Sequence, residues 1–365
     1  MKKSILSTLL ATVSASFAAG DLNSDIQQLT GDATKGYMAP LTSAVGADLN
    51  AGYFNHSPKP ELWGIDFQVG MNFVWSNFTD TKTFAADGNI SISESMADAL
   101  AEQMVASEAS IPSNLREAAR AQLAQKLVGQ KVGVRFQGPT AVGSTTDKVN
   151  LIVTSSPSVT VPSTTVAFDA TGYSVPTEVS GTGIDDILPG IPLPYPQFNI
   201  GTVAGTQIAF RGFPGSLPVD GLGDVSFWGI GINHNPGYWN DKENYIPYGI
   251  NSSVTMTYTQ FSIGDNFNWS GWSLGVMASR RVGFRFLNLT PYAGLGMEGS
   301  TLELKYQYDA GVPGVPPVDI SIEQEGDAFL YMNGGLGLRL GIFNFDFGGR
   351  YSANPGGNIG VTLAI

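Results

Sequence analysis

A Ser-His-Asp hydrolase built from this chain would need His56 or His234 as its general base, because the 365 residues contain no other histidine. Residues 271–275 read Gly-Trp-Ser-Leu-Gly, but they lie inside an expected strand and not at the strand-to-helix turn on which the nucleophilic serine of a hydrolase sits. His234 comes directly before an Asn-Pro-Gly sequence, which is typical of a turn. We interpret His234 as a hydrogen-bonding residue at the end of a strand, and we predict that the protein is not an enzyme.

Residues that could bind a metal ion are equally sparse. There is no cysteine, and the two histidines are not at ligand spacing. Asp185 and Asp186 form an acidic pair on their own, and residues 240–244 and 264–266 are loops with Asp and Asn that could bind Ca²⁺ only weakly. Solvated turns explain these loops better, so the sequence predicts neither a metal site nor a cofactor.

The longest regular pattern lies between Trp63 and Trp75, where every odd-numbered residue is apolar and most even-numbered residues are polar or glycine. A period of two indicates a β-strand with one apolar face. Such a strand is about 40 Å long and crosses about 28 Å at a tilt of about 45°, close to the ~25 Å apolar band of membrane barrels. Trp63 and Trp75 would then lie at the two membrane interfaces. A long strand of a soluble sandwich is the alternative.

Composition also favours a membrane barrel. Charged residues make up 14 % of the chain, against about 25 % in typical soluble proteins. A barrel explains this deficit because one face of each strand is covered by lipid. The net charge of −12 argues against nucleic acid as a partner, because nucleic-acid binding requires basic patches.

The N-terminal segment has the features of a secretory signal peptide over residues 1–18. Lys2 and Lys3 precede an apolar stretch at residues 5–13, and residues 16–18 provide a small-x-small cleavage site. No later stretch of about 18 apolar residues follows, so the sequence excludes a helical membrane protein.

Two other regions have helical patterns. Residues 19–46 form an N-terminal helical segment, with Asp21–Thr30 as its first helix, and a short strand from Asp48 to Phe54 is expected to follow. Residues 91–130 predict an inserted helical hairpin, because apolar residues recur every four positions and Pro112 divides them. A plug or lid and a solvated insertion both remain open for this hairpin.

Residues 138–196 are rich in Ser, Thr and Pro. Because closely spaced prolines interrupt the interior strands of a sheet, we expect edge strands and extended loops there. From Phe198 onwards the alternating pattern resumes. The expected strands are Asn199–Gly212, Leu222–His234, Gly249–Ile263, Ser270–Phe284, Leu289–Tyr306, Ala328–Leu340, Phe343–Ser352 and Asn358–Ile365.

The connections between these strands differ in length. Asn288 and Asn344 each lie at a tight turn, whereas residues 309–326 form a long loop. Short turns on one rim and long loops on the other are typical of membrane barrels. The predicted fold class is all-β, a transmembrane antiparallel β-barrel of roughly 10–14 strands over residues 47–365 with an N-terminal helical segment and an inserted helical hairpin.

The chain resembles bacterial single-chain outer-membrane β-barrels, and among them an uncharacterised family distantly like the long-chain fatty-acid transport barrels. The matching segments are 37–42, 208–214, 228–234 and 360–365. In outer-membrane barrels the last strand is an assembly signal that ends at an aromatic residue, whereas this chain ends at Ile365. The resemblance implies the outer membrane as location, and outer-membrane lipid and the barrel-assembly machinery as partners.

Polar residues on the inner strand faces are the candidate functional residues. Arg339 and Asp346 are expected to lie across one hairpin, directly or diagonally opposed. Either an ion-paired, filled lumen or a charged constriction that selects solutes would follow. The residues expected to face the lumen are Asp66, Gln68, Asn72, Asn333, Arg339, Asp346 and Arg350.

The sequence therefore predicts an outer-membrane barrel that passively transports a small or hydrophobic solute. One alternative is a structural or surface-interaction barrel without an open pore. A second alternative is a secreted, soluble β-rich binding protein. Nucleic acid and cofactors are not expected as partners in any of these.

Overall fold

The structure is a computed structural model, and it describes residues 31–78, 82–92, 94–156, 158–162, 167–213, 215–219, 223–239, 249–284, 286–308 and 318–364. The predicted signal peptide, residues 1–18, and the first predicted helix, Asp21–Thr30, lie outside the described residues. Among the described residues, no helix has both the length and the apolar character that crossing a bilayer requires.

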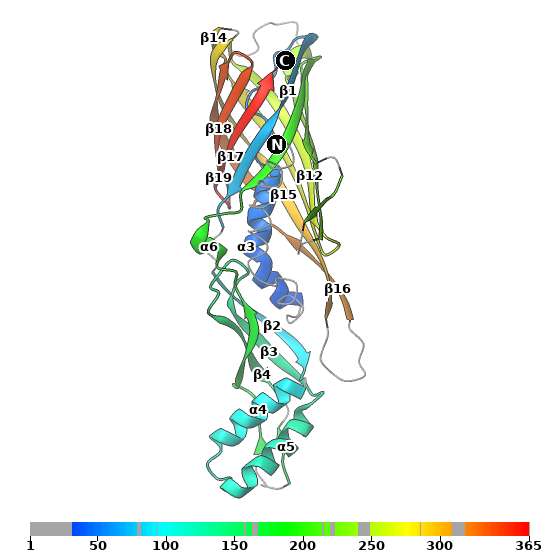
Figure 1. The fold of residues 1–365 in the computed structure, drawn as a ribbon, viewed down its shortest axis with the longest axis vertical. Helices are drawn as coiled ribbons and strands as arrows, with labels where there is room; N and C mark the ends of the chain where they lie inside the picture. Colours follow the sequence, from blue (N-terminus) through cyan, green and yellow to red (C-terminus); the bar gives the residue numbers. More distant parts are fainter. Residues whose placement is uncertain are drawn as a thin grey trace.

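Ten antiparallel strands close into a barrel, which confirms the predicted fold class at the low end of the expected strand number (Figure 1). Each strand pairs with two neighbours, and pairing of β9 with β11 and of β19 with β1 completes the ring. Closure satisfies the backbone donors and acceptors within the barrel, as a bilayer requires. The barrel strands are β1 Trp63–Ser76, β8 Leu193–Val203, β9 Thr206–Gly212, β11 Gly223–His234, β12 Asn251–Ile263, β13 Phe267–Ser279, β15 Leu287–Tyr308, β17 Leu330–Leu340, β18 Phe343–Tyr351 and β19 Gly356–Ala364.

The outer face of the barrel is apolar. On β1, Phe67 is 43 % exposed while its neighbour Gln68 is 6 % exposed, as period-two alternation requires. The same alternation recurs around the barrel and gives a continuous apolar outer surface. Exposed outward residues include Val69, Phe73, Phe198, Phe210, Trp228, Tyr258, Trp272, Leu274, Val276, Leu295, Met332, Leu336, Phe347, Ile359, Val361 and Leu363.

Each rim of the barrel carries both short and long connections. At the upper rim in Figure 1, β1 begins, β19 ends, and two-residue turns join β8 to β9 and β17 to β18. The short strand β14, Val282–Phe284, pairs with β15 at this rim. At the lower rim, β15 extends beyond the barrel and pairs with β16, Val318–Glu325. The short strand β10, Leu217–Val219, pairs with the start of β11.

The chain between β1 and β8 forms an accessory domain below the lower rim (Figure 1). Its sheet has the order β2-β3-β4-β7 and is antiparallel. The helical hairpin that the sequence predicts is present, but its helices pack within this domain and not in the barrel lumen. The elements are β2 Thr83–Ser91, α4 Glu94–Ser107, η1 Ser113–Leu115, α5 Arg116–Leu127, β3 Lys131–Pro139, β4 Lys148–Ser155, β5 Val159–Thr160, β6 Ala167–Phe168, β7 Ser174–Ser180 and α6 Ile184–Ile187.

The expectation of loops and edge strands over residues 138–196 is therefore wrong in part. β4 is an interior strand, paired with β3 on one side and β7 on the other. Pro194 and Pro196 belong to barrel strand β8. The pairing of β8 with β9 begins only at Gln197, so the proline-bearing half of β8 is paired on the β1 side alone. Proline is tolerated in such a half-paired strand because no second ladder needs its missing N–H.

Two further expectations need correction. The predicted strand Asn199–Gly212 is two strands, β8 and β9, joined by a turn at Ala204 and Gly205. The predicted strand Asp48–Phe54 begins within a helix: α3 spans Gly31–Asn50, and residues 51–54 follow it without strand pairing. Helix α3 thus extends beyond the predicted boundary at residue 46.

Helix α3 connects the accessory domain to the barrel (Figure 1). Near its N-terminus, Tyr37 packs edge-on against Phe84 of β2, and its hydroxyl donates to the carbonyl oxygen of Ser180 at 2.8 Å. Its C-terminal half enters the barrel and contacts β12, β13 and β15. One apolar cluster runs from the accessory domain along α3 into the lower half of the barrel.

Candidate functional site: the barrel lumen

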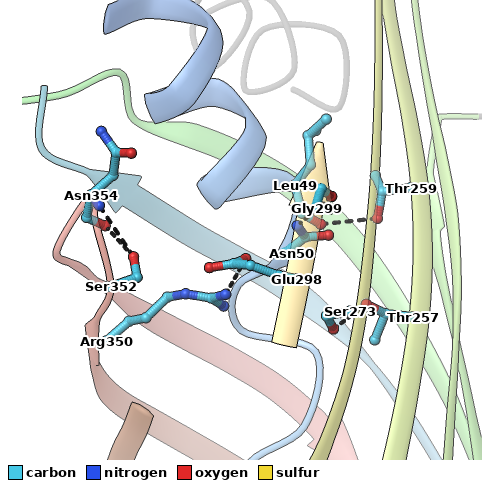
Figure 2. Close-up of polar contacts among 10 residues, drawn as sticks. All are labelled: Leu49, Asn50, Thr257, Thr259, Ser273, Glu298, Gly299, Arg350, Ser352 and Asn354. Atoms are coloured by element: carbon cyan, nitrogen blue, oxygen red, sulfur yellow. Dashed lines mark hydrogen bonds and ion pairs between the residues drawn. The ribbon is translucent and has the colours of Figure 1, made fainter. Parts of the chain in front are cut away.

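The lower half of the lumen is an apolar core around the end of α3. Val45 and Leu49 are buried there together with inward-facing aromatic residues of β11, β12 and β13. The backbone at the helix end is bonded to the wall. Thr259 Oγ1 donates to the carbonyl oxygen of Leu49 at 2.9 Å, and Asn50 Nδ2 donates to that of Gly299 at 3.2 Å (Figure 2). The helix is therefore held in the lumen both by packing and by hydrogen bonds.

Residues 51–62, which we call the plug segment, continue from α3 to the start of β1 at the upper rim. Because this segment is irregular, its backbone polar groups need partners from the wall. Wall side chains supply them along its length. The donors and accepting carbonyl oxygens are Tyr195 Oη to Ala51 at 3.2 Å, Gln197 Nε2 to Tyr53 at 2.9 Å, Asn233 Nδ2 to His56 at 2.9 Å and Asn235 Nδ2 to Pro58 at 2.7 Å.

Arg211 of β9 holds the plug segment by its side chain as well. Its guanidinium carbon lies 3.4 Å from the ring centre of Tyr53 and 4.1 Å from that of Tyr195. Its Nε donates to Gln197 Oε1 at 2.7 Å, and the residue is only 4 % exposed. A desolvated cation between two aromatic faces is a strong form of cation–π contact, of about 2 kcal/mol. Arg211 thus joins the plug segment to β8 and β9.

Arg339 and Asp346 lie on neighbouring strands of one hairpin, but each bonds to other groups. Register places Arg339 opposite Asn344, and Asp346 opposite Gly337. Arg339 Nε instead donates to the carbonyl oxygen of Gly341 at 3.1 Å. Asp346 accepts hydrogen bonds from Asn358 Nδ2 at 2.5 Å and from Tyr292 Oη at 3.4 Å. Arg339 and Asp346 are therefore diagonal neighbours across the hairpin, one of the two placements that the sequence allowed, and among the described residues each bonds to other groups.

Among the described residues, a buried ion pair inside the barrel joins Arg350 of β18 to Glu298 of β15 (Figure 2). Both side chains are nearly fully buried, and the Arg350 guanidinium carbon lies 4.2 Å from the ring centre of Tyr331. The sequence predicted that Arg350 faces the lumen. It gave no such prediction for Glu298, because the inward and outward positions of its strand were not assigned. Removing one partner would leave a buried charge uncompensated.

The remaining predicted residues lie as follows. Asn72 is buried and donates to Gln197 Oε1 at 3.1 Å, and Gln68 is buried and donates to Asp66 Oδ2 at 3.0 Å. Asn333 is partly buried on the inward side of β17. Of the two tryptophans expected at the membrane interfaces, Trp63 is exposed at the upper rim and Trp75 is half-buried near the lower end of β1.

Sequence reasoning missed the plug contacts, although the inner faces carry a signal for them. Inward positions change from aromatic to glycine along the same strands. A Cβ on Gly231 of β11 would lie 2.6 Å from Tyr53, and one on Gly271 of β13 would lie 2.8 Å from Asn50 Oδ1. Glycine at these positions leaves space for the plug segment and for the end of α3.

A cavity of about 410 Å³ opens at the upper rim above the plug segment, and we call it the vestibule. Two smaller cavities, of about 30 and 10 Å³, lie between the plug segment and the wall. The vestibule is lined by His56, Ser57, Pro58, Lys59, Glu61, Gly64, Asp66, Gly201, Thr202, Gln207, Asn251, Ser279, Arg281, Thr290 and Arg339.

Both histidines have hydrogen-bond partners that explain their positions. His234 accepts from Trp239 Nε1 at its Nε2 atom at 2.7 Å, and its Nδ1 lies 2.9 Å from Thr206 Oγ1. His56 Nδ1 lies 2.6 Å from Asn55 Oδ1. Within the described ranges, neither ring is hydrogen-bonded to a serine or a carboxylate.

The acidic residues considered as metal ligands do not form a metal site in the described structure. Asp185 and Asp186 pair with Lys82 at 3.0 and 3.6 Å, which ties α6 to the start of the accessory domain. Residues 264–266 are the turn between β12 and β13. Residues 240–244 lie outside the described residues. In the part of the chain that the structure describes, no group of three or more His, Cys, Asp or Glu residues could hold a metal ion.

A closed antiparallel barrel with an apolar outer belt is the architecture of bacterial outer-membrane proteins. Comparison with solved structures returns barrels of this class. The β domain of the Bordetella autotransporter BrkA is 9 % identical with a TM-score of 0.29, covering 82 % of this chain and 99 % of that chain. A loop-deletion mutant of OmpT, an outer membrane protein of Vibrio cholerae, is 10 % identical with a TM-score of 0.22, covering 83 % and 98 %.

No curated protein sequence matches the chain. The model of a family of unknown function, DUF6588, matches residues 1–365, and the chain therefore belongs to this family.

Proposed function

We propose that this protein is an outer-membrane barrel closed by its own N-terminal segment, which acts as a structural or surface-interaction barrel and presents the accessory domain. The observation that supports this best is the burial of the C-terminal half of α3 and of the first part of the plug segment inside the ring of ten strands. Barrels of about eight strands are filled by side chains alone, and diameter grows with strand number. A ten-stranded barrel is wider, and here α3 takes up the added space.

The contacts that α3 and the plug segment make with the barrel wall support a closed resting state. Fully burying an aliphatic side chain such as Val45 or Leu49 contributes about 1.5–3 kcal/mol each. Each wall-to-plug hydrogen bond adds about 0.5–1.5 kcal/mol. Moving α3 and the plug segment out of the lumen would lose these contributions together, so thermal fluctuation alone would not open the lumen.

The position of the accessory domain supports a role at the cell surface. In bacterial barrels the short turns face the periplasm and the long connections face outward. Both two-residue turns, β8 to β9 and β17 to β18, lie at the upper rim, and the longest connection, the accessory domain between β1 and β8, lies at the lower rim. The connection of β11 to β12 over residues 235–250 and the turn of β12 to β13 at residues 264–266 depart from this division. α3 contributes buried residues to the apolar cluster that the accessory domain and the barrel share, and it fixes the domain relative to the barrel.

Cysteine labelling in whole cells tests this orientation, because the chain has no cysteine of its own. Ala121→Cys places a thiol on the exposed face of α5, and Ile342→Cys places one in the turn at the upper rim. A membrane-impermeant maleimide should label Ala121→Cys in intact cells and Ile342→Cys only after lysis. The reverse pattern would place the accessory domain in the periplasm and contradict the surface role.

Passive transport of a solute is the second candidate, and the vestibule is the observation that favours it. A polar cavity of about 410 Å³ gives a solute access to the upper side of the plug. The purified wild type should show no steady conductance in planar bilayers. If transport occurs by displacement of the plug, Arg211→Gln should produce openings, because it removes the cation between Tyr53 and Tyr195. Steady conductance by the wild type would instead refute the closed barrel.

The helical hairpin gives a control for the plug assignment. α4 and α5 lie in the accessory domain, so replacing residues 94–127 with a short linker should not change conductance. An increase in conductance on this replacement would mean that the hairpin, and not α3, obstructs the lumen.

A further inference from the structure

Two arginines line the vestibule, and among the described residues neither forms an ion pair with a carboxylate. Arg281 follows β13 at the upper rim, and Arg339 lies near the upper end of β17. Both line the cavity of about 410 Å³ and also its narrow extension of about 30 Å³. His56 of the plug segment and Thr290 of β15 line the same two spaces.

Two acidic residues also line the vestibule, and each has a partner other than these arginines. Glu61 pairs with Lys59 at 3.3 Å, and Asp66 accepts a hydrogen bond from Gln68 at 3.0 Å. Among the described residues no ion pair joins Arg281 or Arg339 to a carboxylate. Arg339 uses its Nε for the carbonyl of Gly341, which leaves its terminal nitrogens available. The extension is lined by these two arginines and by no Asp or Glu.

Buried polar side chains also line the vestibule. Gln207 of β9 is 3 % exposed, lines the vestibule and has an amide oxygen with no hydrogen-bond partner in the described structure. Thr290 is also buried beside Arg281 and Arg339 in the cavity wall. Buried polar atoms are normally bonded to protein, water or ligand. The vestibule wall thus contains a buried polar side chain whose oxygen is not bonded within the described structure.

We infer that the vestibule binds a small solute through an oxyanion group, a carboxylate or a phosphate, held between Arg281 and Arg339. Guanidinium groups match the geometry of such oxyanions and donate charge-assisted hydrogen bonds. A volume of about 410 Å³ is within the ~300–1,000 Å³ range of ligand pockets, while the extension admits only a small head group. The plug segment forms the floor, so this site does not require an open lumen and goes beyond the proposed function.

Titration calorimetry on the full-length protein in a neutral detergent tests the site. Three probes are titrated: inorganic phosphate, succinate and a short-chain phosphatidic acid, with glucose as an uncharged control. We expect saturable binding of at least one oxyanion and none of glucose. Binding by phosphatidic acid alone would assign the oxyanion to a lipid head group, and binding by phosphate or succinate would assign it to a free solute.

Matched arginine variants locate the binding. Arg281→Gln and Arg339→Gln should each weaken the oxyanion at least tenfold, which equals about 1.4 kcal/mol. Arg280→Gln removes a neighbouring exposed charge that does not line the vestibule, and it should change affinity less than twofold. Heat-dependent gel mobility verifies that each variant is a folded barrel. Absence of saturable binding by all three oxyanions, or equal weakening by Arg280→Gln, would overturn the inference.

Discussion

Gly46 offers a quantitative test of how α3 sits in the barrel. It lies on α3 against Ser300 of β15, and a Cβ added at Gly46 would lie 2.5 Å from Ser300 Cβ and even closer to its hydroxyl. Rotation of the hydroxyl cannot relieve the Cβ overlap, because that atom is fixed by the backbone of β15. Gly46→Ala should therefore cost about 1–3 kcal/mol of overpacking, offset by about 1 kcal/mol of gained helix propensity.

Substitutions at Ser300 separate the two effects. Ser300→Gly removes the Cβ, and the nearest remaining atom of the residue is then its Cα, at 3.9 Å, an ordinary contact. In that background Gly46→Ala should stabilise the protein by about 1 kcal/mol, so the coupling energy of the double-mutant cycle is about 1–3 kcal/mol. Ser300→Ala keeps the Cβ and should give no rescue.

Urea unfolding of the purified barrel in lipid or detergent, followed by the fluorescence of its tryptophans, measures these differences. Trp269 is fully buried in the lumen and reports on the plug environment. Stabilisation by Gly46→Ala in both backgrounds, with no coupling to residue 300, would refute the packing of α3 on β15.

Three further predictions concern the outer face, the accessory domain and the plug segment. Phe67→Arg should cost about 2–4 kcal/mol by placing a charge in lipid, and Gln68→Glu, one residue along, should cost far less; equal costs in a folding assay would invert the assigned facing. Arg135 bonds the carboxylate of Asp87 through Nε at 2.8 Å and a terminal nitrogen at 3.0 Å, and these bonds hold the pKa of Asp87 below its usual value. The stabilisation from this pair is therefore present above the unfolded-state pKa and is lost as pH falls through the lowered pKa; an NMR titration showing an unshifted carboxyl would contradict the pair. Tyr53→Phe should destabilise the barrel by about 0.5–1.5 kcal/mol through loss of the 2.5 Å hydroxyl contact with Thr259, and an unchanged urea midpoint would argue against it.

The outer surface could be predicted from the sequence because lipid imposes a simple rule on every strand. An outward residue must be apolar, so alternation located strands such as β11, β12, β17 and β18 to within a few residues. The division of β8 from β9 escaped detection. Ala204 and Gly205 both have positive φ, of 49° and 68°, as in a type I′ turn, but alanine is uncommon there and gives no warning in the sequence.

The lumen was harder to predict because its contacts depend on three-dimensional packing. Whether Arg350 meets Glu298 depends on which strands face each other across the barrel, and alternation within one strand says nothing about that. The plug had a detectable trace in the inward glycines such as Gly231 and Gly271. Glycine is also common in membrane strands for other reasons. The inward glycines therefore indicate a buried helix only when the structure shows the helix beside them.

Disulfide trapping tests the central claim, that α3 occupies the lumen, most directly. Leu49 Cβ lies 3.2 Å from a Cβ built on Gly271 of β13, close to the ~3.5–4.5 Å between Cβ atoms in disulfides. In this cysteine-free chain, Leu49→Cys with Gly271→Cys should form an intramolecular disulfide in the folded barrel, seen as a mobility shift without reductant and by mass spectrometry. The control pairs Leu49→Cys with Trp272→Cys, whose side chain faces outward, and it should not cross-link. Efficient cross-linking of only the first pair is the predicted result, and its failure in folded protein, or equal cross-linking of both pairs, would contradict a lumen filled by α3.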